Sequence, residues 1–189
     1  METIKAYTRQ RAEVLMELEK NGVYQVKEAH IREKNDSISE YYLDLYRWYT
    51  REAAKRVPLP ARAEFPIWLF LRKEEKLPLI PGTVVLELEI PKDKVVITEV
   101  ERWGYRVNYM YIPLDAADEK NHEAELKRYG IGNETALIQT AKGNFYPLLK
   151  RKIIASWQRL FAPPRDSALV VSQGTVWELR KEWLINVEK

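Results

Sequence analysis

The two segments Phe65-Pro-Ile-Trp-Leu-Phe-Leu71 and Val84-Val-Leu-Glu-Leu-Glu-Ile-Pro91 decide the fold of this chain. The first is a continuous apolar run, which has the length of a buried strand and is far too short to span a membrane. In the second, Glu87 and Glu89 alternate with apolar residues, as in a strand with one buried face. A polar turn at 91–94 precedes a third short strand at 95–97. We expect these strands to form the central sheet.

The segments before and after this sheet are predicted to add strands and helices. Further strands are expected at 3–8, 168–171, 175–179 and 184–187, and residues 23–26 form a short strand or an extended arm. Helices are expected at about 10–21, from 37 to the prolines at 58 and 60, at 115–128 and at about 145–160. The mixture predicts an α+β fold, in which helices pack against a mixed, mostly antiparallel sheet.

Several helix ends carry recognisable signals. Gly22 follows the first predicted helix at the position where a left-handed residue is favoured. Asn35 or Asp36 is a candidate N-cap of the second, and Ser37 with Glu40 matches a capping box. The last helix is predicted to bury an apolar stripe formed by Phe145, Leu149, Ile153, Trp157 and Leu160.

Length and composition set the class of protein. A chain of 189 residues fits a single domain covering 1–189, and 31% charged residues are typical of an ordinary globular protein. The net charge of +3 neither requires nor excludes a nucleic-acid partner. The absence of cysteine excludes disulfides and thiolate zinc sites and fits a cytoplasmic protein. No signal peptide and no membrane contact are expected, because the N-terminus has no apolar run.

Well-known catalytic motifs are absent from the sequence. The two histidines, His30 and His122, lie in separate polar segments, which excludes a His-Glu-x-x-His zinc site. The chain has no Gly-x-Ser-x-Gly elbow, no Gly-x-x-x-x-Gly-Lys loop and no Gly-x-Gly-x-x-Gly fingerprint. No metal is expected, because Glu87 and Glu89 lie near lysines and are better explained as a solvated, salt-bridged strand face.

Polar and aromatic residues gather instead at predicted strand ends. They are Thr8, Arg9, Trp68, Trp103, Asn108, Gln173 and Glu178. Each also has a structural interpretation, with Trp68 in the core, Asn108 as a cap or turn and Gln173 in a loop. Together they would form one cleft only if the strand ends converge.

The motifs Tyr7-Thr-Arg-Gln10, Pro66-Ile-Trp68, Leu86-Glu-Leu-Glu-Ile-Pro91 and Gln173-x-x-x-Trp177 resemble a small, functionally unassigned bacterial and phage family. The resemblance covers nearly the whole chain. More distantly, the layout is similar to the ADP-ribosyltransferase fold, which has a polar residue closing the first strand and Gln or Glu near the C-terminal strands.

The second resemblance implies an NAD-dependent enzyme acting on an unknown protein or nucleic-acid acceptor. Thr8 or Arg9 would contact the dinucleotide, Trp68 or Trp103 would stack on a ring, and Asn108 would complete the cofactor site. The catalytic residue would be Gln173 or Glu178, which would orient the ribose or the acceptor.

A non-catalytic nucleic-acid-binding module is the alternative prediction. The helix near Phe145 carries Lys150, Arg151 and Lys152, with Arg159 about two turns later, interleaved with aromatic residues. Such a surface could hold phosphates and stack bases, although charge runs are more often solvated helix faces. A protein-interaction subunit without a ligand is a third possibility, to which a Tyr- and Trp-rich surface is suited.

Overall fold

The computed structural model describes residues 2–165, 167 and 169–189 and has the predicted α+β class. Its main sheet has the strand order β5-β6-β3-β1-β4-β8, and β2 pairs with β7 in a separate two-stranded sheet. The strands are β1 (Thr3–Arg11), β2 (Val23–Tyr24), β3 (Ile67–Phe70), β4 (Thr83–Pro91), β5 (Val96–Glu99), β6 (Ser172–Val176), β7 (Leu179–Arg180) and β8 (Leu184–Glu188). The pairs β1–β3, β1–β4, β3–β6 and β4–β8 are all antiparallel.

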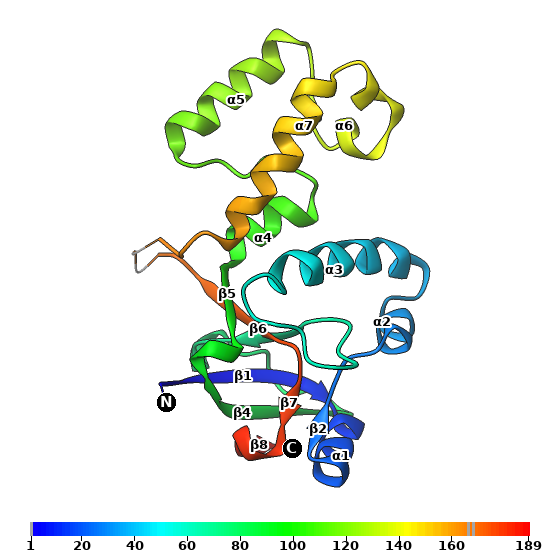
Figure 1. Cartoon of the computed structure of the whole chain (residues 1–189), viewed down its shortest axis with the longest axis vertical. Helices are drawn as coiled ribbons and strands as arrows, with labels where there is room; N and C mark the ends of the chain where they lie inside the picture. Colours follow the sequence, from blue (N-terminus) through cyan, green and yellow to red (C-terminus); the bar gives the residue numbers. More distant parts are fainter. Residues whose placement is uncertain (1, 166, 168) are drawn as a thin grey trace. The chain divides into compact units, whose positions relative to one another are not determined.

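The chain divides into two compact units, Met1–Ile97 with Ser172–Lys189 and Thr98–Val171. The first unit holds most of the sheet with helices α1 (Ala12–Asn21), α2 (Glu28–Asn35) and α3 (Ser39–Ala53) (Figure 1). The second holds α4 (Val100–Val107), α5 (Ala116–Arg128), α6 (Ala136–Gln139) and α7 (Pro147–Ser156). The single domain expected from chain length stays a prediction.

One face of the sheet packs against α1. Strand β1 pairs with β4 along its whole length, from Thr3↔Pro91 to Arg11↔Thr83. This register turns the apolar residues of β4 to one face, where they form a core with Val14, Leu15 and Leu18 of α1. On the other face of β4, Glu89 accepts a hydrogen bond from the Thr3 hydroxyl and Glu87 lies 4.0 Å from the Lys5 amine. The predicted solvated, charged strand face is therefore present.

Helix α3 covers the opposite face at β3 and β6. Trp68 lies across from Thr175, so their side chains share one face of the sheet. The Tyr49 hydroxyl is 2.8 Å from the Thr175 hydroxyl, and the Tyr49 and Trp68 ring centroids are 5.0 Å apart. A buried polar contact and an aromatic contact thus fix α3 to the sheet.

Strands β1 and β3 pair at a single position and then separate. Their only register pair is Tyr7↔Phe70. One residue further along β1, the Thr8 hydroxyl donates a hydrogen bond to the Trp68 carbonyl at 3.0 Å. In a regular antiparallel ladder this carbonyl would accept a backbone N–H of β1 instead. Residues 8–11 of β1 keep their pairing with β4, so this part of β1 is unpaired only along the edge that faces β3.

The second unit is helical and is stabilised by buried polar contacts between α7 and the segment after α4. The Trp157 indole N–H donates to the Met110 carbonyl at 2.9 Å. The Ile112 N–H donates to the Ser156 hydroxyl at 2.9 Å. Asp115 is the N-cap of α5, because its carboxylate accepts the Asp118 N–H at 2.8 Å.

Several local predictions were wrong. Ser37 and Glu40 form no capping box, because residues 36–38 make a 3-10 turn and α3 starts without a side-chain cap. Helix α2 was not predicted, since its residues are mostly polar and show no clear apolar stripe. Phe145 is 80% exposed because α7 begins two residues later, at Pro147.

The strand expected at 168–171 lies partly outside the described residues, and 169–171 are not in a strand. The strand expected at 175–179 is interrupted, with β6 ending at 176 and β7 beginning at 179.

Substitution of Gly22 tests its role as the residue that ends α1. Its φ of 75° is left-handed, so a Gly22→Ala change should destabilise the protein by about 1 kcal/mol, although a new methyl group meets no atom within 4 Å. Gly104, inside α4, also has open space around it but an ordinary helical backbone, so Gly104→Ala should stabilise by up to about 1 kcal/mol. Opposite shifts in urea unfolding are expected, and equal shifts would contradict the cap assignment.

Candidate functional site

A cavity of about 400 Å³ opens in the first unit near the place where β1 and β3 separate. It is lined by the end of β1, the start of β3, helices α1, α2 and α3, and the loop before β4. Lining residues that matter here are Arg9, Arg11, Tyr24, His30, Tyr46 and Trp68. The volume falls within the range of small-molecule sites, about 300–1,000 Å³.

Aromatic rings supply much of the apolar wall. The Trp68 ring centroid is 6.1 Å from that of Tyr46. Burial raises the pKa of both Tyr24 and Tyr46 to about 12. The two hydroxyls therefore stay protonated and neutral at physiological pH, and the wall offers rings with polar tips rather than charge.

Cationic side chains lie beside the rings. The Arg9 guanidinium donates one N–H to the Pro78 carbonyl at 2.8 Å, which holds it against the loop before β4. Arg11 is engaged by Glu33 through two hydrogen bonds of 2.8 Å. Since a guanidinium has five donors, Arg9 keeps donors for a phosphate or carboxylate. The cavity combines aromatic and anion-binding groups.

A wider hollow of about 750 Å³ adjoins the cavity, since Glu17 and His30 line both. Its wall includes Glu178, which is 7% exposed. The Glu178 carboxylate accepts hydrogen bonds from the Gln25 amide at 3.0 Å and the Arg180 guanidinium at 2.7 Å. These contacts fix the orientation of a carboxylate at the edge of a ligand-sized space.

The structure brings together some of the predicted site residues. Thr8, Arg9 and Trp68 meet where β1 and β3 separate. Glu178 lines the adjoining hollow, whereas Gln173 lies across from Phe70 with its amide nitrogen buried and lines neither space.

Trp103 and Asn108 belong to the second unit, at α4. Asn108 follows the helix as its C-cap residue, and its side-chain amide donates to the Gly104 carbonyl at 2.9 Å. The interpretation of Asn108 as a cap is confirmed. Trp103 lies in the middle of the helix rather than at a strand end.

His30, Tyr24 and Tyr46 line the cavity but were not predicted as site residues. Tyr46 was hidden within an apolar helix face, and His30 within a charged segment whose helix was missed. No capping signature in the sequence marks His30, because Lys27 is not a favoured N-cap residue. Only the structure shows that His30 is the third residue of α2 and that its ring accepts the Lys27 N–H.

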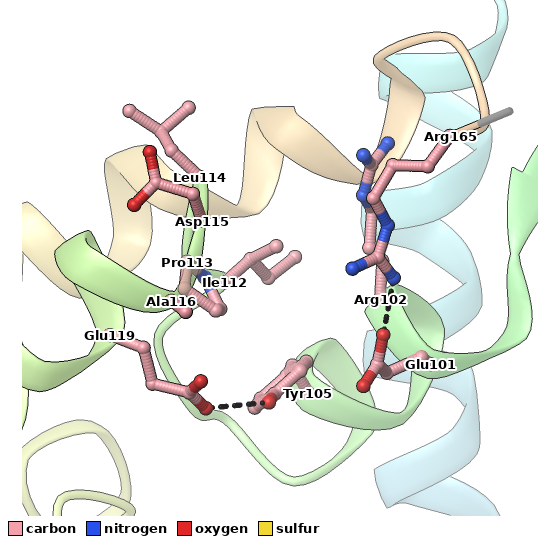
Figure 2. A pocket seen from close by; sticks show the side chains of 10 residues that line it. All are labelled: Glu101, Arg102, Tyr105, Ile112, Pro113, Leu114, Asp115, Ala116, Glu119 and Arg165. Atoms are coloured by element: carbon pink, nitrogen blue, oxygen red, sulfur yellow. Dashed lines mark hydrogen bonds and ion pairs between the residues drawn. The ribbon is translucent and has the colours of Figure 1, made fainter. Parts of the chain in front are cut away.

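The second unit has a smaller pocket of about 140 Å³, shown in Figure 2. Tyr105 lies on one wall and donates its hydroxyl to Glu119 at 3.0 Å. On another wall, Arg165 binds Glu101 and the fully buried Glu99, which also lies 3.2 Å from Arg102. The charged groups of this pocket largely satisfy one another.

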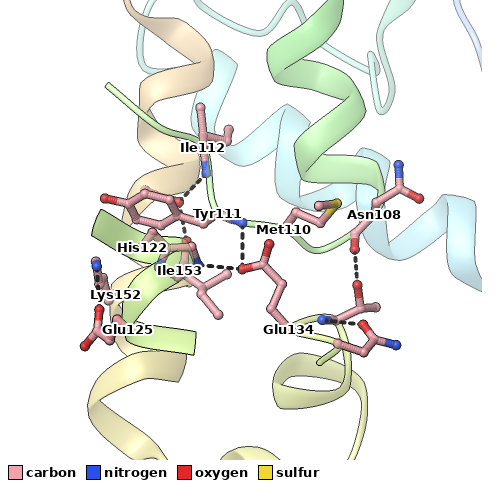
Figure 3. A network of polar contacts seen from close by, with 12 residues as sticks. Asn108, Met110, Tyr111, Ile112, His122, Glu125, Glu134, Lys152 and Ile153 are labelled. Atoms are coloured by element: carbon pink, nitrogen blue, oxygen red, sulfur yellow. Dashed lines mark hydrogen bonds and ion pairs between the residues drawn. The ribbon is translucent and has the colours of Figure 1, made fainter. Parts of the chain in front are cut away.

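A buried polar network joins α5, α6 and the segment after α4 (Figure 3). The His122 Nε2 lies 2.8 Å from the Glu134 carboxylate, which also accepts the Tyr111 N–H at 3.3 Å. The Tyr111 and His122 rings stack with centroids 4.1 Å apart. This network ties Glu134, in the turn before α6, to the middle of α5.

The predicted basic surface of α7 is partly neutralised. Lys152 pairs with Glu125 at 2.7 Å, and Arg159 pairs with Asp118 at 2.8 Å. The Leu114 N–H, the Tyr111 hydroxyl and Arg159 hold the pKa of Asp118 below its ordinary value. Within the described part of the chain, Lys150 and Arg151 form no ion pair. Two of the four predicted cations are thus already bound to carboxylates.

No group of three or more His, Asp or Glu residues that could hold a metal ion occurs among residues 2–165, 167 and 169–189. Over the same residues, every helix is too short or too polar to cross a membrane.

The fold and cavity define an α+β protein with a ligand-sized, aromatic and cationic site. The chain belongs to the family described as Domain of unknown function (DUF3841), whose family model matches residues 5–185. Searches of curated proteins and of solved structures found no match.

The buried Glu99 supports a pH-dependent prediction. Burial alone would raise the pKa of Glu99, but hydrogen bonds from Arg165 and the charge of Arg102 outweigh it and hold the pKa below its usual range. Stability from this group is therefore present above the unfolded-state pKa and lost as pH falls through the folded-state pKa. Glu99→Gln should lower the free energy of unfolding by about 3 kcal/mol at neutral pH, because it leaves the two arginines beside an uncharged buried amide.

The control is Glu101→Gln, which removes an exposed partner of the same Arg165 and should cost less than about 1 kcal/mol. Urea unfolding near neutral pH and in acid measures the stability of both variants. A Glu99→Gln deficit that does not shrink in acid would contradict the assignment.

Proposed function

We propose that this protein binds NAD in the cavity between β1 and β3 and transfers ADP-ribose to a protein or nucleic-acid acceptor. The observation that carries the proposal is that Arg9 and Trp68, expected to contact a dinucleotide, line one cavity of about 400 Å³. Trp68 offers a ring face for stacking, and Arg9 offers guanidinium donors for phosphate.

The adjoining hollow supports a dinucleotide rather than a mononucleotide. NAD has two nucleoside halves joined by a pyrophosphate, and it needs more room than one cavity of this size. Glu17 and His30 line both spaces, so a ligand passing between them would have one half beside Trp68 and the other beside Glu178. Two spaces that share lining residues suit an extended ligand with two ring systems.

Glu178 is the better candidate for catalysis of the two residues expected from the sequence. In the proposed reaction the bond between nicotinamide and ribose breaks, nicotinamide leaves with the electron pair, and an acceptor oxygen or nitrogen bonds to the ribose carbon and releases its proton to water. Positive charge develops on the ribose, and a fixed carboxylate stabilises it best where water is excluded. Glu178 is nearly buried and held by Gln25 and Arg180. Gln173 lines neither space.

Nucleic-acid binding by α7 is the second candidate and is less well supported. Lys152 and Arg159 would have to give up Glu125 and Asp118 before they could bind phosphate. The pair Lys150 and Arg151 alone would give a shallow salt dependence, with a log–log slope of roughly −0.7 to −0.9 per phosphate contact.

NAD binding should be visible as stabilisation. A ligand that binds only the folded state adds about 2.7 kcal/mol at a hundredfold excess over its dissociation constant. NAD should therefore raise the melting temperature, and Arg9→Ala should reduce this increase. Arg9→Ala is preferable to a Trp68 variant, because Trp68 also packs against α3.

The matched control is Arg72→Ala, at an exposed arginine that pairs with Glu75 and lines neither space. This variant should respond to NAD like the natural chain. An unchanged melting temperature of the natural chain at millimolar NAD would count against the proposal.

Catalysis is tested by Glu178→Gln, which keeps the side-chain size and removes the charge. Transfer from labelled NAD to cell extract should fall by about a hundredfold or more, while NAD binding is retained. Glu182→Gln, at an exposed second partner of Arg180, should transfer normally. Equal transfer by both variants would exclude Glu178 as the catalytic residue.

A further inference from the structure

His30 lies where the cavity and the adjoining hollow meet, on the first turn of α2. The backbone N–H of Lys27 points to its Nδ1 at 3.2 Å, and the His30 N–H donates to the Lys27 carbonyl at 3.0 Å. Its ring also stacks on Tyr24, with centroids 5.9 Å apart. These contacts hold the imidazole in one orientation.

The Lys27 contact determines which ring nitrogen carries the proton. A backbone N–H can only donate, so Nδ1 must accept and must be deprotonated. The Tyr24 hydroxyl, 3.4 Å from Nδ1, is compatible with a second weak donation to the same atom. The neutral imidazole then carries its hydrogen on Nε2.

Nε2 is available for a ligand. Among the described residues it has no hydrogen-bond partner, and it is not one of the buried unpaired atoms. A rigid ring therefore presents an unused N–H donor at the junction of two ligand-sized spaces.

We propose that His30 binds the pyrophosphate of the dinucleotide by donating its Nε2–H to a phosphate oxygen. The inference rests on the proposed function and adds a residue to that site. Arg9 in the cavity and Arg62 in the hollow supply positive charge on both sides of the junction, whereas the Lys27 amine is paired with Glu64 at 3.1 Å. Glu17, the other shared residue, would repel phosphate and is suited to accept a hydrogen bond from a ribose hydroxyl.

Two substitutions separate the two nitrogens of the ring. His30→Asn places an acceptor near the position of Nδ1 and keeps the contact with the Lys27 N–H, but has no donor at the position of Nε2. His30→Gln places an amide donor near Nε2 and loses the fixed acceptor. Calorimetric titration measures the affinity for NAD and for nicotinamide riboside, which has no phosphate. Thermal unfolding without ligand measures the stability that the contact with the Lys27 N–H contributes.

His30→Asn should weaken NAD binding about tenfold or more, leave the affinity for nicotinamide riboside unchanged and keep most of the stability. His30→Gln should bind NAD more tightly than His30→Asn while unfolding at a lower temperature. If the natural chain binds NAD and His30→Asn binds it equally well, His30 is only a capping residue and the inference fails alone. If the natural chain binds no NAD, the proposed function fails and the inference fails with it.

Discussion

The hydrogen bond from the Thr8 hydroxyl to the Trp68 carbonyl marks the point at which β1 stops pairing with β3. The two strands pair only at Tyr7 and Phe70, and one residue further along β1 the side-chain contact of Thr8 takes the place of a ladder hydrogen bond. The remaining residues of β1 keep their pairing with β4, so the separation opens one side of the strand without detaching it. The cavity opens near this gap and has Arg9 and Trp68 on its walls.

A gap of this kind persists because rigid groups surround it. Tyr49 and Tyr46 of α3 pack on Trp68, and α1 packs against the other face of the sheet. At the junction with the adjoining hollow, the first turn of α2 fixes the His30 ring through the Lys27 N–H. The wall of the site is therefore built from side chains whose orientations are set before a ligand arrives, which lowers the entropic cost of binding.

Sequence patterns identified the central strands well, because alternation in β4 and the apolar run of β3 report directly on burial. They failed for α2, whose side chains are mainly polar, and for the start of α7, where Pro147 at the first helical turn leaves Phe145 outside the helix. Thr8, Arg9 and Trp68 could be selected from the sequence as candidates, but their meeting depended on converging strand ends, which only the structure shows. The positions of His30 and Glu17 at both spaces could not be predicted, since these depend on how α1 and α2 approach the sheet.

The account predicts that NAD lies against Trp68 and His30. Nuclear magnetic resonance of the protein, with each tryptophan indole N–H assigned, tests this directly during titration with NAD. The Trp68 indole and His30 ring signals should shift together and saturate, while the Trp157 indole, which donates to the Met110 carbonyl in the second unit and lines neither space, stays unchanged. Saturating NAD that leaves Trp68 and His30 unperturbed, or that shifts only residues of 98–171, would contradict the account.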